Sequence, residues 1–225
     1  MGKPKLLDLF CGAGGAARGY QRAGFYVVGI DLCPQPNYCG DEFIQADAFD
    51  SVVDLMRFDA IHASPPCQGY TVLRNAPGAL GGPRLISRTR GLLQATGKPW
   101  IIENVEAARP AMRNPLLLCG SMFGLKSQGC ELRRHRLFES NLDLSAPTCN
   151  HTDGPVVGVY GGHARKRSAK HGGRGTRDVW LGGHRAAVTE AMGMDWGTLT
   201  EISEAIPPAY TEFLGRQLLK SLSRE

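Results

Sequence analysis

Short apolar segments alternate with helix-like segments through the first half of this chain, and this alternation is the strongest constraint on its fold. The apolar runs read as strands and cover residues 5–10, 26–31, 42–46, 58–63 and 100–105. Helix-like sequences, AARGYQRAGF and SRTRGLLQATG, separate the first pair and the last pair of these runs. Apolar strands separated by helices predict an α/β fold, with a mostly parallel sheet covered by helices on both faces.

Several of these strands are followed by reactive side chains at or just past their carboxyl ends. These side chains are Asp31, Asp47, Cys67 and Glu103. In open parallel sheets, the residues that bind ligands lie at this edge. The spacing therefore predicts one crevice shared by all four residues.

A glycine-rich turn, within DLFCGAGG (8–15), joins the first strand to the first helix. Glycine lets the backbone approach a ligand closely, and a helix N-terminus offers unpaired N–H groups. Asp31 lies 19 residues beyond Gly12, where an acid holds ribose hydroxyls in nucleotide-binding folds. The pattern is compatible with NAD or S-adenosylmethionine as the ligand. It also occurs in turns that are purely structural and bind no ligand. Asp47 suits either an adenine amino group or a solvated strand end.

The segment SPPCQG (64–69) presents Cys67 behind two prolines that fix its backbone. A lone cysteine is more often buried and inert, but this one shares a sheet edge with the glycine-rich turn. Glu103 ends the following strand. Together they suit chemistry at C5 of cytosine, in which a thiolate adds to C6 while a protonated carboxyl donates to N3. A glutamate that is neutral near pH 7 requires a raised pKa, which a closed pocket supplies.

Two arginines stand two positions apart in LRRHRLF (132–138). On an extended segment, Arg134 and Arg136 would project to one side and act together. They would hold the base and a phosphate and favour the thiolate of Cys67. A solvated basic strand is the alternative interpretation.

These motifs, in this order, resemble those of the cytosine-C5 DNA methyltransferases. DLFCGAGG resembles the cofactor motif, PPCQG the catalytic loop and ENV the glutamate motif, while LRRHR resembles a Gln-x-Arg-x-Arg motif. EAIPPAYTEFLGRQL (204–218) resembles the final motif, and RAAVTEAMGMDW (185–196) the segment that organises target recognition. Leu132 departs from the family, which often has Gln there.

The resemblance implies a Rossmann-like methyltransferase fold, a DNA duplex as substrate and a target cytosine swung out of the stack. It implies catalytic roles for Cys67, Glu103, Arg134 and Arg136. It implies contacts with S-adenosylmethionine for Asp8, Phe10, Gly12, Gly14, Gly15, Asp31, Asp47 and Pro66. Gln68 would contact DNA, and residues 69–90 resemble the mobile loop that closes over the flipped base.

The basic charge of the chain is concentrated in residues 161–177, which contain no acid. The stretch carries Arg165, Lys166, Arg167, Lys170, Arg174 and Arg177, so with a net charge of +5 the rest is close to neutral. Such a stretch suits DNA phosphates, with affinity that falls steeply as salt rises. Few side chains remain for reading base edges, which predicts short or relaxed sequence specificity.

We expect three parts in the chain: a catalytic and cofactor-binding domain (1–140), a very small irregular target-recognition region (141–190), and a C-terminal segment returning to the first domain (191–225). No apolar run approaches the ~20 residues of a membrane span, and the N-terminus leaves no room for a signal peptide. The expectation is a cytoplasmic monomer in a bacterial cell, or in a host cell if the protein is phage-encoded.

Seven cysteines form an odd set without framework-like spacing, which favours free thiols. Four residues, Cys119, Cys130, Cys149 and His151, could be assembled into a Cys3His zinc set. Their spacing lacks the paired C-x2-C pattern, so the sequence predicts no metal site. Three alternatives to the main interpretation remain: the same chemistry on transfer RNA, an inactive DNA-binding homologue, and a C5 transfer with an unusual donor or product.

Overall fold

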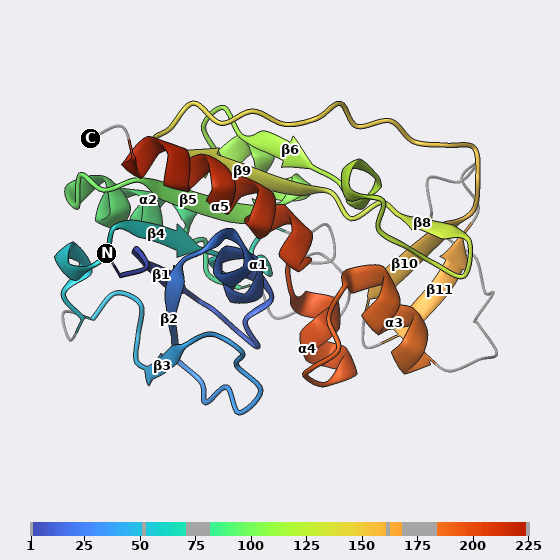
Figure 1. The fold of residues 1–225 in the computed structure, drawn as a ribbon, viewed down its shortest axis with the longest axis horizontal. Coiled ribbons are helices and arrows are strands. Elements are labelled where there is room, and N and C mark those ends of the chain that lie inside the picture. The colour runs from blue at the N-terminus through green and yellow to red at the C-terminus, as the bar shows by residue number, and fades with distance from the viewer. Residues whose placement is uncertain (1, 51–52, 71–81, 161–162, 168–183, 224–225) are drawn as a thin grey trace.

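The computed structural model describes residues 2–50, 53–70, 82–160, 163–167 and 184–223. Among them, no helix combines the length and the apolar character that a membrane span requires. The described chain forms two sheets with helices packed on them (Figure 1).

The larger sheet has seven strands in the order β3-β2-β1-β4-β5-β9-β6. Their bounds are β3 (Glu42–Gln45), β2 (Tyr26–Asp31), β1 (Lys5–Leu9), β4 (Ala60–Ala63), β5 (Trp100–Val105), β9 (Arg136–Ser140) and β6 (Leu116–Leu118). The first five run parallel, while β9 is antiparallel to both β5 and β6. The expected mostly parallel sheet is therefore confirmed, within one or two residues at each strand end.

Helices cover both faces of this sheet, as predicted. Successive side chains of a strand point to opposite faces, so Leu7 and Leu9 pack in one apolar cluster and Leu6 in another. The first cluster includes residues of α2 (Ile86–Ala95), and the second includes residues of α1 (Gly15–Ala23) and α5 (Pro208–Leu222).

Helices α1 and α5 approach each other closely because a glycine lies at their contact. A Cβ atom on Gly19 would lie 2.0 Å from Thr211 Oγ1 and 2.2 Å from the Pro208 carbonyl oxygen. Because Gly19 has no Cβ atom, Thr211 fits against α1, where its Oγ1 donates to the Ala16 carbonyl oxygen at 2.9 Å. This packing holds the C-terminal helix against the helix that follows the glycine-rich turn.

The smaller sheet lies at the right of Figure 1 and has the order β11-β10-β8-β7. Its strands are β7 (Lys126–Ser127), β8 (Cys130–Leu132), β10 (Val156–Tyr160) and β11 (His163–Arg167). Helices α3 (His184–Met192) and α4 (Leu199–Glu204) pack on it around a third apolar cluster. Short 3-10 helices η1 (Leu55–Arg57), η3 (Glu106–Ala111) and η4 (Gly120–Phe123) complete the described elements.

The smaller sheet differs from the irregular region expected over 141–190. Strands β10 and β11 pair as an antiparallel hairpin, and β10 also pairs in parallel with β8, which lies within the part expected to form the first domain. The apolar side of β10 buries Val157 and Val159 against α3 and α4. Glycine and basic residues around this hairpin obscured its short apolar pattern in the sequence.

Candidate active site

The carboxyl ends of β1 and β2 meet at the glycine-rich turn. The backbone N–H of Gly12 donates to Asp31 Oδ2 at 3.0 Å, and the N–H of Cys33 donates to Asp31 Oδ1 at 3.1 Å. Each carboxylate oxygen has a second lone pair, so Asp31 retains acceptor capacity for a ligand. The structure thus brings Asp31 to the turn, as its spacing in the sequence predicted.

The three glycines of the turn have different surroundings. Gly12 has φ 50°, and a Cβ there would meet no described atom within 4 Å. A Cβ on Gly14 would lie 2.9 Å from Cys39 Sγ, and one on Gly15 would lie 2.5 Å from the Ile206 carbonyl oxygen. Gly12 therefore faces open space that a ligand could enter, whereas Gly14 and Gly15 allow close packing of the chain on itself.

Asp8 on β1 is a buried carboxyl group whose oxygens have no partner. It is 0% exposed, and neither side-chain oxygen has a hydrogen-bond partner among the described residues. Burial, followed by the charges of Asp31 and Glu103, raises the pKa of Asp8 well above its usual value. An unpartnered buried polar group is costly, so this carboxyl is poised either to stay protonated or to receive a donor from a ligand.

Asp47 and Phe10 lie beside this turn. Asp47 is exposed, and its Oδ1 accepts from the backbone N–H of Phe49 at 2.9 Å. This arrangement is the solvated strand end that the sequence analysis gave as the alternative to an adenine contact. The Phe10 ring meets the Phe49 ring edge-on, with centroids 5.9 Å apart. A contact of either residue with adenine stays a prediction.

The segment PPCQG (65–69) lies next to the motif ENV (103–105). PPCQG follows strand β4, and ENV ends the neighbouring strand β5. The side-chain amide of Asn104 donates to the Pro65 carbonyl oxygen at 2.8 Å and so ties β5 to the segment after β4. A turn places the N–H of Tyr70 2.9 Å from the Cys67 carbonyl oxygen. Cys67 is half-buried at this edge of the sheet.

Glu103 is a buried acid paired with one arginine. Its side chain is 8% exposed, and its Oε1 lies 3.0 Å from Arg136 Nε, because β5 and β9 run antiparallel beside each other. Burial raises the pKa of Glu103 above its usual value, although Arg136, Arg134 and a hydrogen bond from Ser64 oppose the shift. The direction of this shift is the one that the sequence predicted.

The pKa of Cys67 is also raised, mainly by burial and then by the negative charge of Glu103. Arg136 and Arg134 lower it, in the direction that the sequence predicted, but they do not outweigh burial. The site at rest therefore holds a thiol, and its conversion to the thiolate requires a further positive charge or a proton acceptor.

The chain is similar in sequence to two known methyltransferases. The chain is 31% identical over 117 residues to the Type II methyltransferase M.HgiDI of Herpetosiphon aurantiacus, covering 47% of this chain and 38% of that protein. It is 29% identical over 117 residues to M.HgiGI of the same organism, covering 47% of this chain and 93% of that protein. The chain thus spans well under half the length of the first relative. No family model matches the sequence.

Two solved structures share the whole fold at low identity. One, described as a DNA modification methyltransferase encoded within an E. coli prophage, has a TM-score of 0.60 at 15% identity and covers 99% of this chain. The other, the Entamoeba histolytica methyltransferase EhMeth, has a TM-score of 0.60 at 11% identity and also covers 99%. This chain has a Rossmann-like methyltransferase fold.

Within this methyltransferase fold, Arg134 differs from the sequence expectation. It is 2% exposed, and its guanidinium donates to the carbonyl oxygens of Val159 at 3.1 Å, Ser203 at 2.6 Å and Ala205 at 3.0 Å. Residues 133–135 belong to no strand, so the rule that alternate residues share a side fails there. Arg134 therefore joins β10 to α4, while Arg136 forms an ion pair with Glu103.

The remaining predicted contacts fall in three places. Pro66 is half-buried beside Cys67, and Gln68 is exposed. Three basic residues, Arg165, Lys166 and Arg167, lie on β11, at the edge of the smaller sheet. Lys170, Arg174 and Arg177 lie outside the described residues, as do residues 71–81 of the expected loop 69–90. The last part of that expected loop, 86–90, instead belongs to helix α2.

A buried histidine behind the site was missed in the sequence. His62 on β4 lies 2.9 Å through Nδ1 from the Tyr20 hydroxyl and 2.8 Å through Nε2 from Ser64 Oγ. Burial lowers the pKa of His62 to about 3, so it is neutral. Ser64 in turn hydrogen-bonds to Glu103. The only signal in the sequence was a histidine inside an apolar strand, which usually indicates a satisfied core residue.

The group of side chains that could hold a metal ion also differs from the one weighed in the sequence. Cys119, Cys149 and His151 lie together, but the fourth member of the group is His135. Cys130 belongs instead to the apolar cluster of the smaller sheet.

Proposed function

We propose that this chain is an S-adenosylmethionine-dependent DNA (cytosine-5)-methyltransferase that uses Cys67 as a covalent nucleophile. The observation that carries the proposal is the acid Glu103, buried with a raised pKa and paired with Arg136, on the strand next to the one that leads into Cys67. The names of the Herpetosiphon relatives and of the prophage protein support methyl transfer to DNA.

The residues at the glycine-rich turn fit S-adenosylmethionine, which when bound supplies a methyl group on a sulfonium centre. Asp31 has acceptor capacity for ribose hydroxyls, and Gly12 leaves space beside the backbone. The buried oxygens of Asp8 lack a donor that an ammonium or hydroxyl could provide. A positive centre near the sheet edge would also lower the pKa of Cys67 and favour its thiolate.

Three residues of the chain then have separate roles in the reaction on the base. The Cys67 thiolate adds to C6, while protonated Glu103 donates its proton toward N3, so that C5 gains the electron density it needs to take the methyl group. Arg136 holds the Glu103 carboxyl in place. Loss of the C5 proton to a base then reforms the C5–C6 double bond and expels the thiolate, and the proton on N3 returns to the Glu103 carboxylate. A stacked cytosine hides its C6 face, so the base must leave the duplex first.

The test incubates the protein with S-adenosylmethionine and unmethylated duplex DNA, or with transfer RNA, and then separates the nucleosides by chromatography and mass spectrometry. We expect 5-methylcytosine in DNA from the wild type and from Cys33→Ser, a control at an exposed cysteine. We expect none from Cys67→Ser. N4-methylcytosine, N6-methyladenine, or product only in RNA would contradict the proposal. Cofactor binding measured by calorimetry shows that each variant is folded.

A further inference from the structure

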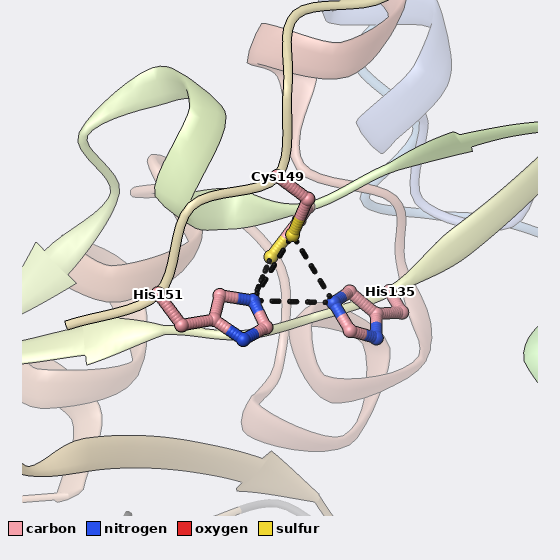
Figure 2. A group of neighbouring side chains, drawn as sticks. His135, Cys149 and His151 are labelled. Carbon is pink, nitrogen blue, oxygen red and sulfur yellow. Dashed lines mark hydrogen bonds between the residues drawn. The ribbon is translucent and has the colours of Figure 1, made fainter. Parts of the chain in front are cut away.

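Four side chains outside the set described above converge on one another. The ligand atoms of Cys119, His135, Cys149 and His151 all lie within 4.8 Å of one another. Figure 2 shows His135, Cys149 and His151 pointing toward a common point. They come from three places in the chain: Cys119 follows β6, His135 precedes β9, and the other two lie on the connection from β9 to β10.

Four of the six separations between ligand atoms are close to those of ligands around one tetrahedral ion. His151 Nε2 lies 3.1 Å from Cys149 Sγ, 3.3 Å from Cys119 Sγ and 3.3 Å from His135 Nε2. Cys149 Sγ lies 3.6 Å from His135 Nε2. Zinc bonds of about 2.3 Å to sulfur and about 2.0 Å to nitrogen place tetrahedral ligands about 3.3–3.8 Å apart.

Hydrogen bonding alone does not account for these contacts. An imidazole Nε2 has one in-plane position, which either donates or accepts a single hydrogen bond. His151 Nε2 has three neighbours within 3.3 Å, and one of them is another imidazole nitrogen. A shared cation at the centre satisfies all of them at once. Both cysteines are free thiols, so no disulfide explains their approach.

The surroundings also orient the ligands toward the centre. Glu106 Oε2 lies 3.2 Å from His135 Nδ1, which leaves Nε2 as the nitrogen that faces the cluster. A carboxylate on the second nitrogen is characteristic of zinc-binding histidines. The hydroxyl of Ser121 donates to Cys119 Sγ at 3.2 Å, a contact that stabilises a thiolate.

We propose that Cys119, His135, Cys149 and His151 bind one Zn²⁺ ion as a closed, structural Cys2His2 site. Four protein ligands complete the tetrahedron, so the ion has no open position for a substrate. The ion would fasten the connection 141–155, all of it described and none of it in a helix or strand, to the edge of the larger sheet where β6 ends and β9 begins. Because His135 stands between Arg134 and Arg136, the ion would also fix the segment that carries both arginines. The inference does not depend on the proposed function.

Metal analysis of the full chain tests the site directly. We expect about one zinc per chain by plasma mass spectrometry. After chelation, added Co²⁺ should give thiolate-to-cobalt charge-transfer bands and the strong visible bands of a tetrahedral ion. A wild type without stoichiometric zinc and without these bands, or a Cys119–Cys149 disulfide in the purified protein, would overturn the proposal.

Matched variants locate the ion. Cys149→Ser and His151→Asn should lose the cobalt bands, while Cys33→Ser, at an exposed cysteine elsewhere, should keep them. Glu106→Gln should weaken zinc binding about 10–100-fold, because it changes only the partner of His135. Equal metal loss in Cys33→Ser and Cys149→Ser would contradict the assignment. The cobalt spectrum of the wild type needs no variant, so it remains decisive if a variant misfolds.

Discussion

At the scale of single residues, the site is defined by the opposing effects of burial and charge on two groups. Burial raises the pKa of both Cys67 and Glu103, which favours the protonated acid but disfavours the thiolate. The two groups also influence each other, because a charge on Glu103 raises the pKa of Cys67. The charge on Glu103 therefore helps to set the pKa of Cys67.

This coupling predicts opposite shifts in two variants. Glu103→Gln removes the negative charge that raises the pKa of Cys67, so alkylation of Cys67 by iodoacetamide should begin at lower pH than in the wild type. Arg136→Met removes a positive charge that lowers this pKa, so alkylation should begin at higher pH. Peptide mass spectrometry across a pH series measures both midpoints. Shifts in the same direction, or no shift in either variant, would contradict the coupling.

The same substitution addresses the acid role. Methyl transfer by Glu103→Gln should fall about 10²–10⁴-fold, because an amide is a poor proton donor to N3. A loss of rate with a more reactive Cys67 would separate the acid role of Glu103 from its effect on the thiol.

At the scale of elements, the parallel strands could be predicted because each contains a short apolar run. Strand β9 could not, because RLFES contains an arginine and a glutamate. Both have partners far away in the sequence: Arg136 pairs with Glu103, and Glu139 accepts from Arg90 Nη2 at 2.8 Å. Buried ion pairs of this kind give a strand a polar sequence, and only the fold reveals them.

The motif residues could be found from the sequence, but the separate role of each residue could not. The sequence suggested that Arg134 and Arg136 act together, whereas Arg134 donates to carbonyl oxygens of Val159, Ser203 and Ala205. These acceptors are backbone atoms, which leave no trace in the side-chain pattern. His135 was likewise invisible as a metal ligand because its partners come from separate segments.

A structural role for Arg134 has a consequence for stability. Arg134→Met should lower the free energy of unfolding by about 2–4 kcal/mol, because three buried carbonyl groups lose a charged donor. Arg216→Met on α5 is the matched control, since that side chain is 67% exposed and its pair with Glu212 lies on the surface. It should change stability by less than about 0.5 kcal/mol. Urea denaturation measures both, and equal stabilities would contradict the role of Arg134 in joining β10 to α4.

At the scale of the whole molecule, the two sheets are joined next to the end of the larger sheet that holds Glu103 and Arg136. Arg134 and the Tyr210 hydroxyl, which donates to the Arg134 carbonyl oxygen at 2.6 Å, lie where β8 gives way to β9. The segment between these strands thus connects the smaller sheet with the strand that carries Arg136.

The central claim is that Cys67 attacks C6 of cytosine, and trapping that adduct tests it most directly. A duplex with 5-fluorocytosine at every cytosine position, incubated with the protein and S-adenosylmethionine, cannot lose a proton from C5 after addition. We predict a stable species with the mass of chain, DNA strand and one methyl group, whose proteolysis maps the bond to Cys67. Cys33→Ser should form the same species and Cys67→Ser none. Attachment at another cysteine, or no adduct from a wild type that methylates ordinary cytosine, would contradict the account.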